Sequence, residues 1–469
     1  MIVEQMIEAA TKEIKENLER FCQESAQEPL SLEGAEMVGK GIRDAVAAAG
    51  RAAFTTYLMA NEESKDIIVV NGETFRFKEF TNKTIISIFG KTSLSRKTFQ
   101  NAADTKSYCP MDEAWGMANE YLTIEVAEAA AFACAHVTAE EAAKLFEKSA
   151  MFHPHPTQMK TAVERIANRV APCREEGDRN IREEERVPVN TRVLVASMDG
   201  VNVLLNEPGK KQGRPAERPK GDERKENKTS YKNAMAGVIS FYGDVREGEK
   251  CPQRLDCRYV SHMPEERAET FKKKFEAEVD DAVAKCLTDI FKVVLCDGAR
   301  GIWNYIDNEE RFAGFEKLID YWHAAEHLSL AAEALFGKGT DEAEAWYQKN
   351  LKRLKEEERG AQCVLDSMDY YGKTRNLSSG RRKDLKTQRT FFARNKHRMA
   401  YADFRRRGLP IGSGPVEAAC KSLVKARLCR SGMRWSRAGG QRILDLRTYV
   451  KSNRWDAFWM EYKKLKSAV

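Results

Sequence analysis

Three acidic residues of this sequence stand where carboxylates can assist a reaction at phosphorus. Asp199 and Asp297 each follow an apolar run and precede a glycine, and Glu417 comes just after Gly414-Pro415. Breaking a phosphodiester and joining its 3′ hydroxyl elsewhere is an in-line displacement, which two divalent ions about 3.5 to 4 Å apart assist. Mg²⁺ (or Mn²⁺) prefers hard oxygen ligands. The three carboxylates are therefore candidate catalytic residues and candidate ligands for two such ions.

The pattern alone leaves a simpler interpretation open. The chain has 71 acidic residues, so a set of three can always be chosen. An Asp-Gly pair after a strand is also an ordinary turn. Glu417 has Lys421 four residues further on, which is the spacing of an ion pair on a helix.

The elements around the two aspartates predict a sheet that would bring them together. The sequence predicts, in order, strands at 193–198, 235–241 and 255–260, a helix at 264–290 and a strand at 292–296. The first and last strands are near-continuous apolar runs, typical of buried central strands. The charged stretch 207–228 predicts a loop. Three strands, a helix and a fourth strand are the opening order of the RNase H-like fold.

The first part of the chain predicts smaller modules. Residues 1–65 have a helical pattern. The apolar run 67–70, the dipeptide Asn71-Gly72 and residues 74–77 predict a β-hairpin. A second strand pair, 84–89 and 93–99, is interrupted by Gly90. Together these residues predict a small β-ribbon.

Two consecutive helices follow the ribbon. Thr138 and Glu141 form a capping box that begins the first helix. The prolines around His153 and His155 end that helix, and Thr157 begins the second. A helix, a short turn and a helix of this size suit a helix-turn-helix DNA reader, although helical pairs are common in proteins without this function. The two histidines are either metal ligands or turn residues.

Charge and composition limit the possible partners. Residues 373–447 hold 21 Lys and Arg against four acids, an excess that a polyanion such as a nucleic-acid backbone would neutralise. The sequence lacks an apolar stretch of the roughly 18 to 20 residues that a membrane helix needs, and its N-terminus does not have the pattern of a signal peptide. We therefore expect a cytoplasmic protein without a membrane partner.

Several strings of this sequence resemble the ISKra-type family of bacterial insertion-sequence transposases. The strings are Ser197-Met-Asp-Gly-Val201, Val294-Leu-Cys-Asp-Gly-Ala-Arg300, Asp320-Tyr-Trp-His-Ala-Ala-Glu-His-Leu328, Ile411-Gly-Ser-Gly-Pro-Val-Glu-Ala-Ala-Cys-Lys421 and Arg427-Leu-Cys-Arg-Ser-Gly-Met-Arg-Trp-Ser436. The similar strings occur in the same order as in the family, and the resemblance covers the chain from about Arg96 to Trp459. It implies a DDE transposase with its catalytic, metal-binding triad at Asp199, Asp297 and Glu417.

The resemblance also implies a domain organisation, with an RNase H-like catalytic domain that a helical insertion interrupts. The expected parts are an N-terminal helical region (1–65), a β-ribbon module (66–110), a helix-turn-helix DNA-binding region (111–173), the first part of the catalytic core (190–311), the helical insertion (312–408) and the C-terminal part of the core with the Glu417 helix (409–469). The expected partners are double-stranded DNA, as element ends and as target, and further copies of the chain in a synaptic complex. Such a protein would associate with the nucleoid in a bacterial cell.

Two other functions fit the same residues. A decayed or domesticated copy would bind DNA with an idle centre, and an RNase H-like nuclease would cut without joining.

One departure from the family pattern concerns how the protein would recognise the ends of its insertion sequence. Family members carry paired cysteines, expected zinc ligands, near the ribbon, whereas residues 97–110 retain only Cys109.

Further candidates lie near these strings. Asp320, His323 and His327 share one helix face, where they would orient the metal site or a phosphate, or else be packed structural residues. Arg427, Arg430, Arg434 and Trp435 lie in the basic region. An aromatic ring flanked by arginines suits an unpaired base and its phosphates, and core packing of Trp435 is the alternative.

Overall fold

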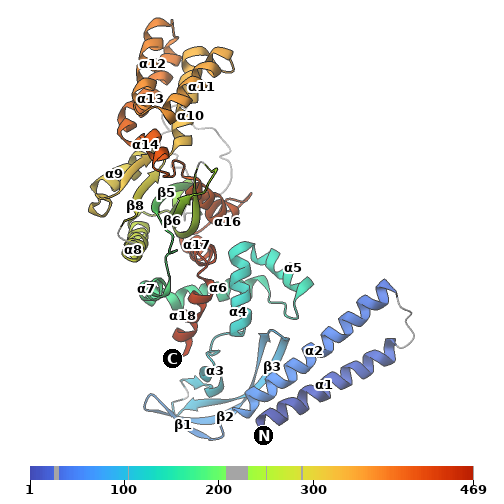
Figure 1. Cartoon of the computed structure of the whole chain (residues 1–469). Coiled ribbons are helices and arrows are strands. Elements are labelled where there is room, and N and C mark those ends of the chain that lie inside the picture. Colours follow the sequence, from blue (N-terminus) through green and yellow to red (C-terminus); the bar gives the residue numbers. More distant parts are fainter. Residues whose placement is uncertain (26–30, 104, 207–230, 250, 287–288, 468–469) are drawn as a thin grey trace, which may run out of the picture. The chain divides into compact units, whose positions relative to one another are not determined.

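The structure, a computed structural model of the chain, describes residues 1–25, 31–103, 105–206, 231–249, 251–286 and 289–467 (Figure 1). It has two compact units, Met1–Asp178 with Trp455–Val469, and Arg179–Arg454. Each unit combines helices with a β-sheet, so the chain is mixed α/β. None of the helices within the described ranges is long and apolar enough to cross a membrane. The predicted loop at 207–228 lies outside the described residues.

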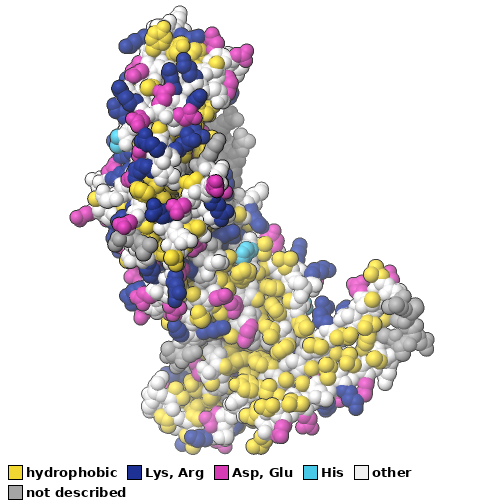
Figure 2. All heavy atoms as spheres, viewed as in Figure 1, with side chains coloured by type: hydrophobic (Ala, Val, Ile, Leu, Met, Phe, Trp, Pro, Cys, Tyr) yellow, Lys and Arg dark blue, Asp and Glu magenta, His cyan; other side chains and the backbone are white. Residues whose placement is uncertain are grey.

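The first unit begins with a hairpin of two long helices, along which hydrophobic side chains gather (Figure 2). Its elements are α1 (Ile2–Ser25), α2 (Leu32–Ala60), β1 (Ile67–Val70), β2 (Glu73–Ser87), β3 (Gly90–Asn101), β4 (Ser107–Tyr108), α3 (Pro110–Ala114), α4 (Ile124–His136), α5 (Ala139–Ser149), α6 (Pro156–Val170), η1 (Ala171–Cys173) and α18 (Trp455–Ser467). Helix α7 (Arg174–Glu184) runs from this unit into the second.

A four-stranded antiparallel sheet in the order β1-β2-β3-β4 forms the ribbon of this unit. Asn71 and Gly72, with φ of 50° and 79°, make the predicted turn between β1 and β2. The two predicted strand pairs belong to one sheet, because the single strand β2 takes part in both of them. The register between β2 and β3 shifts at a bulge between Phe77 and Glu79.

Helices α5 and α6 are the predicted pair. The Thr138 side chain accepts a hydrogen bond from the Glu141 backbone, and the Glu141 carboxylate accepts one from the Thr138 backbone. His155 caps α6, because its Nδ1 accepts a hydrogen bond from the Thr157 N–H at 3.3 Å. Of the two interpretations of His155, the structure therefore favours the turn residue.

The second unit contains β5 (Val193–Leu204), β6 (Tyr231–Val245), β7 (Pro252–His262), α8 (Glu269–Lys285), β8 (Phe291–Cys296), α9 (Arg300–Asn308), η3 (Glu310–Phe312), β9 (Glu316–Ile319), α10 (Tyr321–Phe336), α11 (Asp341–Glu356), α12 (Gly360–Thr374), α13 (Ser379–Asn395), η4 (Lys396–Arg398), α14 (Tyr401–Arg406), α15 (Gly414–Ala419), η5 (Cys420–Lys425), α16 (Ala426–Leu428) and α17 (Arg437–Lys451). Its five-stranded sheet has the order β7-β6-β5-β8-β9. Strands β5, β6 and β7 pair antiparallel, whereas β8 and β9 run parallel to β5.

The predicted strands and helix of this sheet are present. Phe271 and Phe275 of α8 are fully buried against the sheet in one large hydrophobic core. Strand β9, four residues long, was missed, because the sequence from 312 to 407 was expected to be almost wholly helical. Four residues are too few to show a period of two, so their strand is fixed by pairing with β8.

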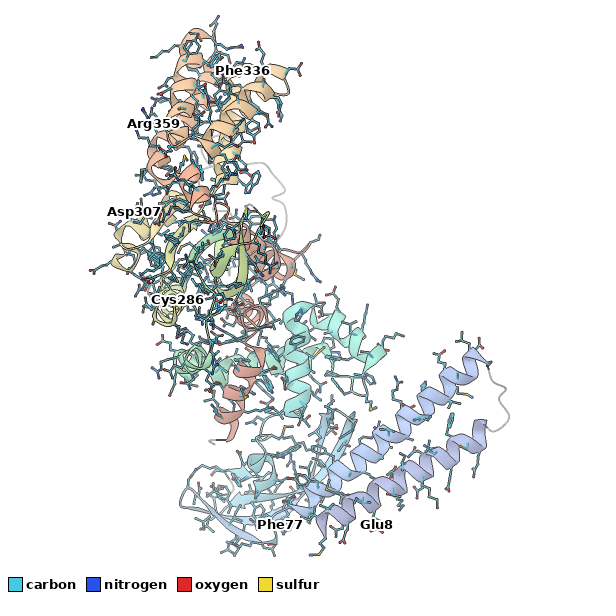
Figure 3. The ribbon with its side chains drawn as sticks, viewed as in Figure 1. Glu8, Phe77, Cys286, Asp307, Phe336 and Arg359 are labelled. Atoms are coloured by element: carbon cyan, nitrogen blue, oxygen red, sulfur yellow. The ribbon has the colours of Figure 1, made fainter. Side chains whose placement is uncertain are left out.

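The helices α10 to α13 pack on one another beyond β9. Phe336 at the end of α10 and Arg359 just before α12 lie in this helical region, and Asp307 lies at the end of α9 (Figure 3). The Phe336 ring contacts the rings of Trp346 and Tyr371, so the helices share an aromatic core.

The C-terminal helix differs from the expectation that 409–469 completes the catalytic core. Helix α18 belongs to the first unit, where the Trp455 indole donates a hydrogen bond to Glu128 and its ring packs against Phe132. An amphipathic helix packs wherever a complementary face exists, and the sequence of one helix does not specify which.

Candidate active site

The pairing of β5 with β8 places Asp199 and Asp297 beside each other. Val195 pairs with Val293, an offset of 98 residues, and the same offset separates Asp199 from Asp297. Asp297 is the first residue after β8, whereas β5 continues past Asp199 to Leu204. The expectation that β5 ends at Asp199 was therefore wrong. The strand continues because β6 still pairs with it where β8 has ended.

Asp199 has a thiol neighbour that the sequence did not single out. The Cys420 thiol donates a hydrogen bond to Asp199 Oδ2 at 3.4 Å, and the Gly200 N–H donates one to Oδ1 at 2.6 Å. Burial and the nearby Asp199 charge raise the pKa of Cys420 well above its usual value, so the thiol stays protonated and remains a donor. Its position three residues after Glu417 was the available clue.

Asp297 lies at a crowded turn. Its Oδ1 accepts a hydrogen bond from the Ala299 N–H at 2.9 Å. Burial raises the pKa of Asp297, and the neighbouring carboxylates of Asp199 and Asp320 raise it further. Gly298 is required by packing, since a Cβ there would lie 2.2 Å from the Phe391 ring of α13. The Asp297-Gly298 pair thus lies where the end of β8 contacts helix α13 of the helical region.

Asp320 continues the row of aspartates along the sheet edge. Cys296 pairs with Ile319, so Asp297 and Asp320 are the next residues on adjacent parallel strands. Asp320 is buried and caps α10 by accepting the His323 N–H at 2.8 Å. Its other oxygen accepts the Ser413 N–H. The Asp320 carboxylate therefore fixes the segment that leads to α15. This positioning role agrees with the expectation that Asp320 orients the site.

Glu417 lies in the first turn of α15 with its side chain half exposed. Lys421 is 3.7 Å away, which is the ion pair expected from their spacing. Val416 and Ala419 of the same helix are buried against Val238 of β6. Cys420, three residues after Glu417, contacts Asp199, so the helical segment that carries Glu417 lies beside that aspartate.

The carboxylates suit a hard divalent cation in their chemistry. Asp199 and Asp297 present oxygen ligands at a sheet edge, and their mutual repulsion is relieved by a cation between them. Within the described ranges, no group of three or more His, Cys, Asp or Glu side chains is placed closely enough to hold a metal ion. The structure thus brings the two aspartates together and leaves Glu417 with Lys421.

The two histidines of α10 have different surroundings. His327 stacks on Phe391 at 3.6 Å between ring centroids, and its Nδ1 lies 2.6 Å from Gln388 Oε1. Burial lowers its pKa. His323 is half-buried and is one of the charges that lower the pKa of Asp297. His327 is thus a packed residue, and His323 faces the carboxylates.

The basic segment after α15 is more ordered than a free binding loop. The Trp435 backbone bridges to Leu205 beside β5, and its indole donates a hydrogen bond to the Leu428 carbonyl at 3.0 Å. The buried Arg427 guanidinium lies 5.1 Å from the centre of its ring. Arg434 is exposed and Arg430 is half-buried. Trp435 is half-buried, so its ring is neither free nor part of the core.

Comparison with known proteins adds little. No family model and no curated protein matches the chain. Among solved structures, the chain is similar to one described as the "Drosophila P element transposase strand transfer complex", with 8% sequence identity and a TM-score of 0.25 over 75% of this chain and 84% of that one. A TM-score this low carries no argument about fold or function, so any functional conclusion rests on the residues themselves.

Proposed function

We propose that the chain is a DDE transposase that binds the ends of its insertion sequence and catalyses metal-dependent strand cleavage and strand transfer. The observation that carries the proposal is the register of the parallel strands β5 and β8, whose offset of 98 residues also separates Asp199 from Asp297, the residue that follows β8. The element order from β5 to β8 supports an RNase H-like core, since it is the opening order expected of that fold.

In this proposal Asp199, Asp297 and Glu417 hold two Mg²⁺ or Mn²⁺ ions. Such ions would activate the attacking oxygen and stabilise the leaving one. Glu417 would serve as the third carboxylate, and its half-exposed side chain is paired with Lys421 in the structure. Cys420 keeps Asp199 oriented through its hydrogen bond, and Asp320 holds the segment before α15.

The test uses purified full-length protein, Mg²⁺ and DNA carrying the element's ends. Asp199→Asn and Asp297→Asn should each reduce cleavage by about 1,000-fold or more, because the amide keeps the shape and loses the charge that holds the ion. Binding to the ends should be nearly unchanged.

Asp256→Asn is the matched control. Asp256 lies on β7 of the same sheet and accepts the N–H of its own neighbour, Cys257, at 2.8 Å, much as Asp199 accepts that of Gly200. Cleavage followed by joining supports the transposase, cleavage alone supports a nuclease, and binding without cleavage supports an idle centre. Full activity in Asp199→Asn would remove that residue from the site.

A further inference from the structure

A polar cavity of about 660 Å³ lies in the first unit between the ribbon and the helix pair. Its walls include Lys83, Lys91 and Arg96 from β2 and β3, and Arg165 from α6. His153 and Tyr121 complete its rim, and none of the described residues that line it is acidic. A second cavity of about 470 Å³ shares Ile86, Lys91 and His153 with the first and adds Arg43, Arg51 and Asp44 of α2, with Asp44 3.9 Å from Arg43. The two cavities thus form one predominantly basic hollow.

Part of this positive charge is already neutralised. Asp112 pairs with Lys83 and Arg96, and Glu120 pairs with Arg165. The side chains of Lys91 and His153 are exposed, and within the described part of the chain neither has a hydrogen-bond or ion-pair partner. Lys91 lies where the two cavities meet, so it is the cation best placed to receive an anionic group.

Close packing fixes Lys91 in this place. The tip of the β2–β3 hairpin inserts Phe89 against Gly50 of α2, where a Cβ would lie 2.3 Å from the ring. Gly90, with φ of +103°, passes so close to the Met151 carbonyl that a Cβ would lie 3.0 Å from it. Three segments that are distant in sequence therefore meet at the residue preceding Lys91, and the cation is held on a rigid support.

The first cavity is also lined by an aromatic ring and by side-chain amides. Tyr121 is 54% exposed, and its backbone carbonyl accepts the Ile86 N–H at 2.8 Å, which fixes the residue to the ribbon. The side-chain amides of Asn82 and Asn119 line the cavity and have no hydrogen-bond partner among the residues that the structure describes. An exposed ring stacks on a base, and free amides recognise a base edge.

We infer that this hollow binds an unpaired nucleotide of a DNA strand, with the base between Tyr121 and the amides and the phosphate at Lys91 and His153. The size fits, since pockets for small organic groups are about 300 to 1,000 Å³. The inference rests on the proposed function for the identity of the polyanion and deepens it by assigning a reader of strand ends. This mode of binding differs from that of a helix-turn-helix, because the DNA enters a pocket of the protein and no helix has to enter the major groove.

The test measures binding of full-length protein to labelled element ends, fully paired or with a single-stranded overhang, at several salt concentrations. Lys91→Gln should weaken binding about 3- to 10-fold and reduce the slope of log affinity against log salt by about 1, the effect of one phosphate contact. Lys78→Gln, an exposed lysine of the same strand pair outside both cavities, is the control and should change neither.

Tyr121→Ala should weaken binding of the overhang about 5- to 100-fold and binding of the paired end much less, and Tyr121→Phe should restore it. The melting temperature of each variant verifies folding. Unchanged binding in Lys91→Gln and Tyr121→Ala, or equal losses for both DNA forms in Tyr121→Ala, would overturn the inference. A deoxynucleoside monophosphate that binds as tightly as DNA would also overturn the assignment to a strand.

The two proposals can fail separately. If the wild-type protein binds overhangs in this pattern but does not cleave with Mg²⁺, the pocket stands and the transposase is wrong. If it cleaves and joins ends while the pocket variants bind normally, the pocket is wrong and the transposase stands.

Discussion

Each unit holds an aspartate that is largely withdrawn from solvent, Asp112 buried and Asp297 half-buried, and the two differ in what surrounds them. In the first unit Asp112 lies between two cations, with Lys83 Nζ at 2.9 Å and Arg96 Nε at 3.3 Å. In the second unit Asp297 lies beside two other carboxylates, Asp199 and Asp320. The first arrangement pairs the carboxylate with opposite charges, whereas the second places carboxylates beside one another, a repulsion that a bound cation would relieve. Carboxylates that crowd one another therefore indicate function better than burial does.

The largest expected effect tests this comparison through stability. Asp112→Asn should lower the free energy of unfolding by about 3 to 5 kcal/mol, because it leaves Lys83 buried without a counter-charge. Asp297→Asn should leave stability in metal-free buffer unchanged or higher, because the amide removes a crowded charge. Chemical denaturation measures both. Asp66→Asn, at a largely exposed partner of Lys97, is the control for losing an ion pair. Equal losses of stability in Asp112→Asn and Asp297→Asn would contradict the comparison.

The next effect extends the contrast to two tryptophans of the second unit. Trp322 is 59% exposed beside Gly412, next to the buried Asp320, whereas Trp435 has a bonded indole and an arginine over its ring. Trp322→Ala should weaken binding of distorted or single-stranded ends by about 1 to 3 kcal/mol, as expected for a stacking ring, without lowering the melting temperature.

Trp435→Ala should show the opposite pattern. Its half-buried ring contributes to packing, so we expect a loss of about 2 kcal/mol of stability and little change in the affinity of the folded protein. Measuring the melting temperature and the end-binding affinity of both variants separates the two roles. Unchanged stability with weakened binding in Trp435→Ala would restore the stacking role predicted from its arginines.

The smallest effect concerns the packed histidine. Burial lowers the folded-state pKa of His327 below its ordinary value of 6.5, so the folded protein binds fewer protons there than the unfolded chain. Stability should therefore fall as the pH decreases from about 6.5 through the folded pKa. His327→Phe, which cannot titrate, should lose less stability over the same range. The stabilities of the wild-type protein and of His327→Phe are also compared at pH 8, where His327 is neutral in both the folded and the unfolded state. This comparison corrects for the change in packing. An identical pH dependence would show that His327 is free to protonate.

The sequence predicted the features that are encoded locally. The apolar runs before Asp199 and Asp297 gave two central strands, Asn71-Gly72 gave a turn, and Thr138 with Glu141 gave a capping box, because each depends on residues a few positions apart. Glu417 was named from its position after Gly414-Pro415 and from a family resemblance, and its approach to the two aspartates stays a prediction.

What the sequence could not give depends on pairing over long distances. The 98-residue offset between β5 and β8, the thiol of Cys420 on Asp199 and the short strand β9 are set by register and packing. The basic hollow is a stronger example, since its walls come from α2, the ribbon and the turn before α6. No local pattern links Lys91 with His153, and only the fold brings them together.

The helical region between β9 and α15 begins and ends at the same place beside the sheet, so that its first and last residues contact each other. The Tyr321 N–H donates to the Ile411 carbonyl at 3.0 Å, and the Ser413 N–H donates to Asp320. A segment whose ends already meet has no required length, and changing the length of such an excursion costs little closure entropy. Changing the length of this region should therefore leave the sheet and its aspartates in place, provided that the hydrophobic core shared by the sheet and the helices, including Phe391 over Gly298, is kept.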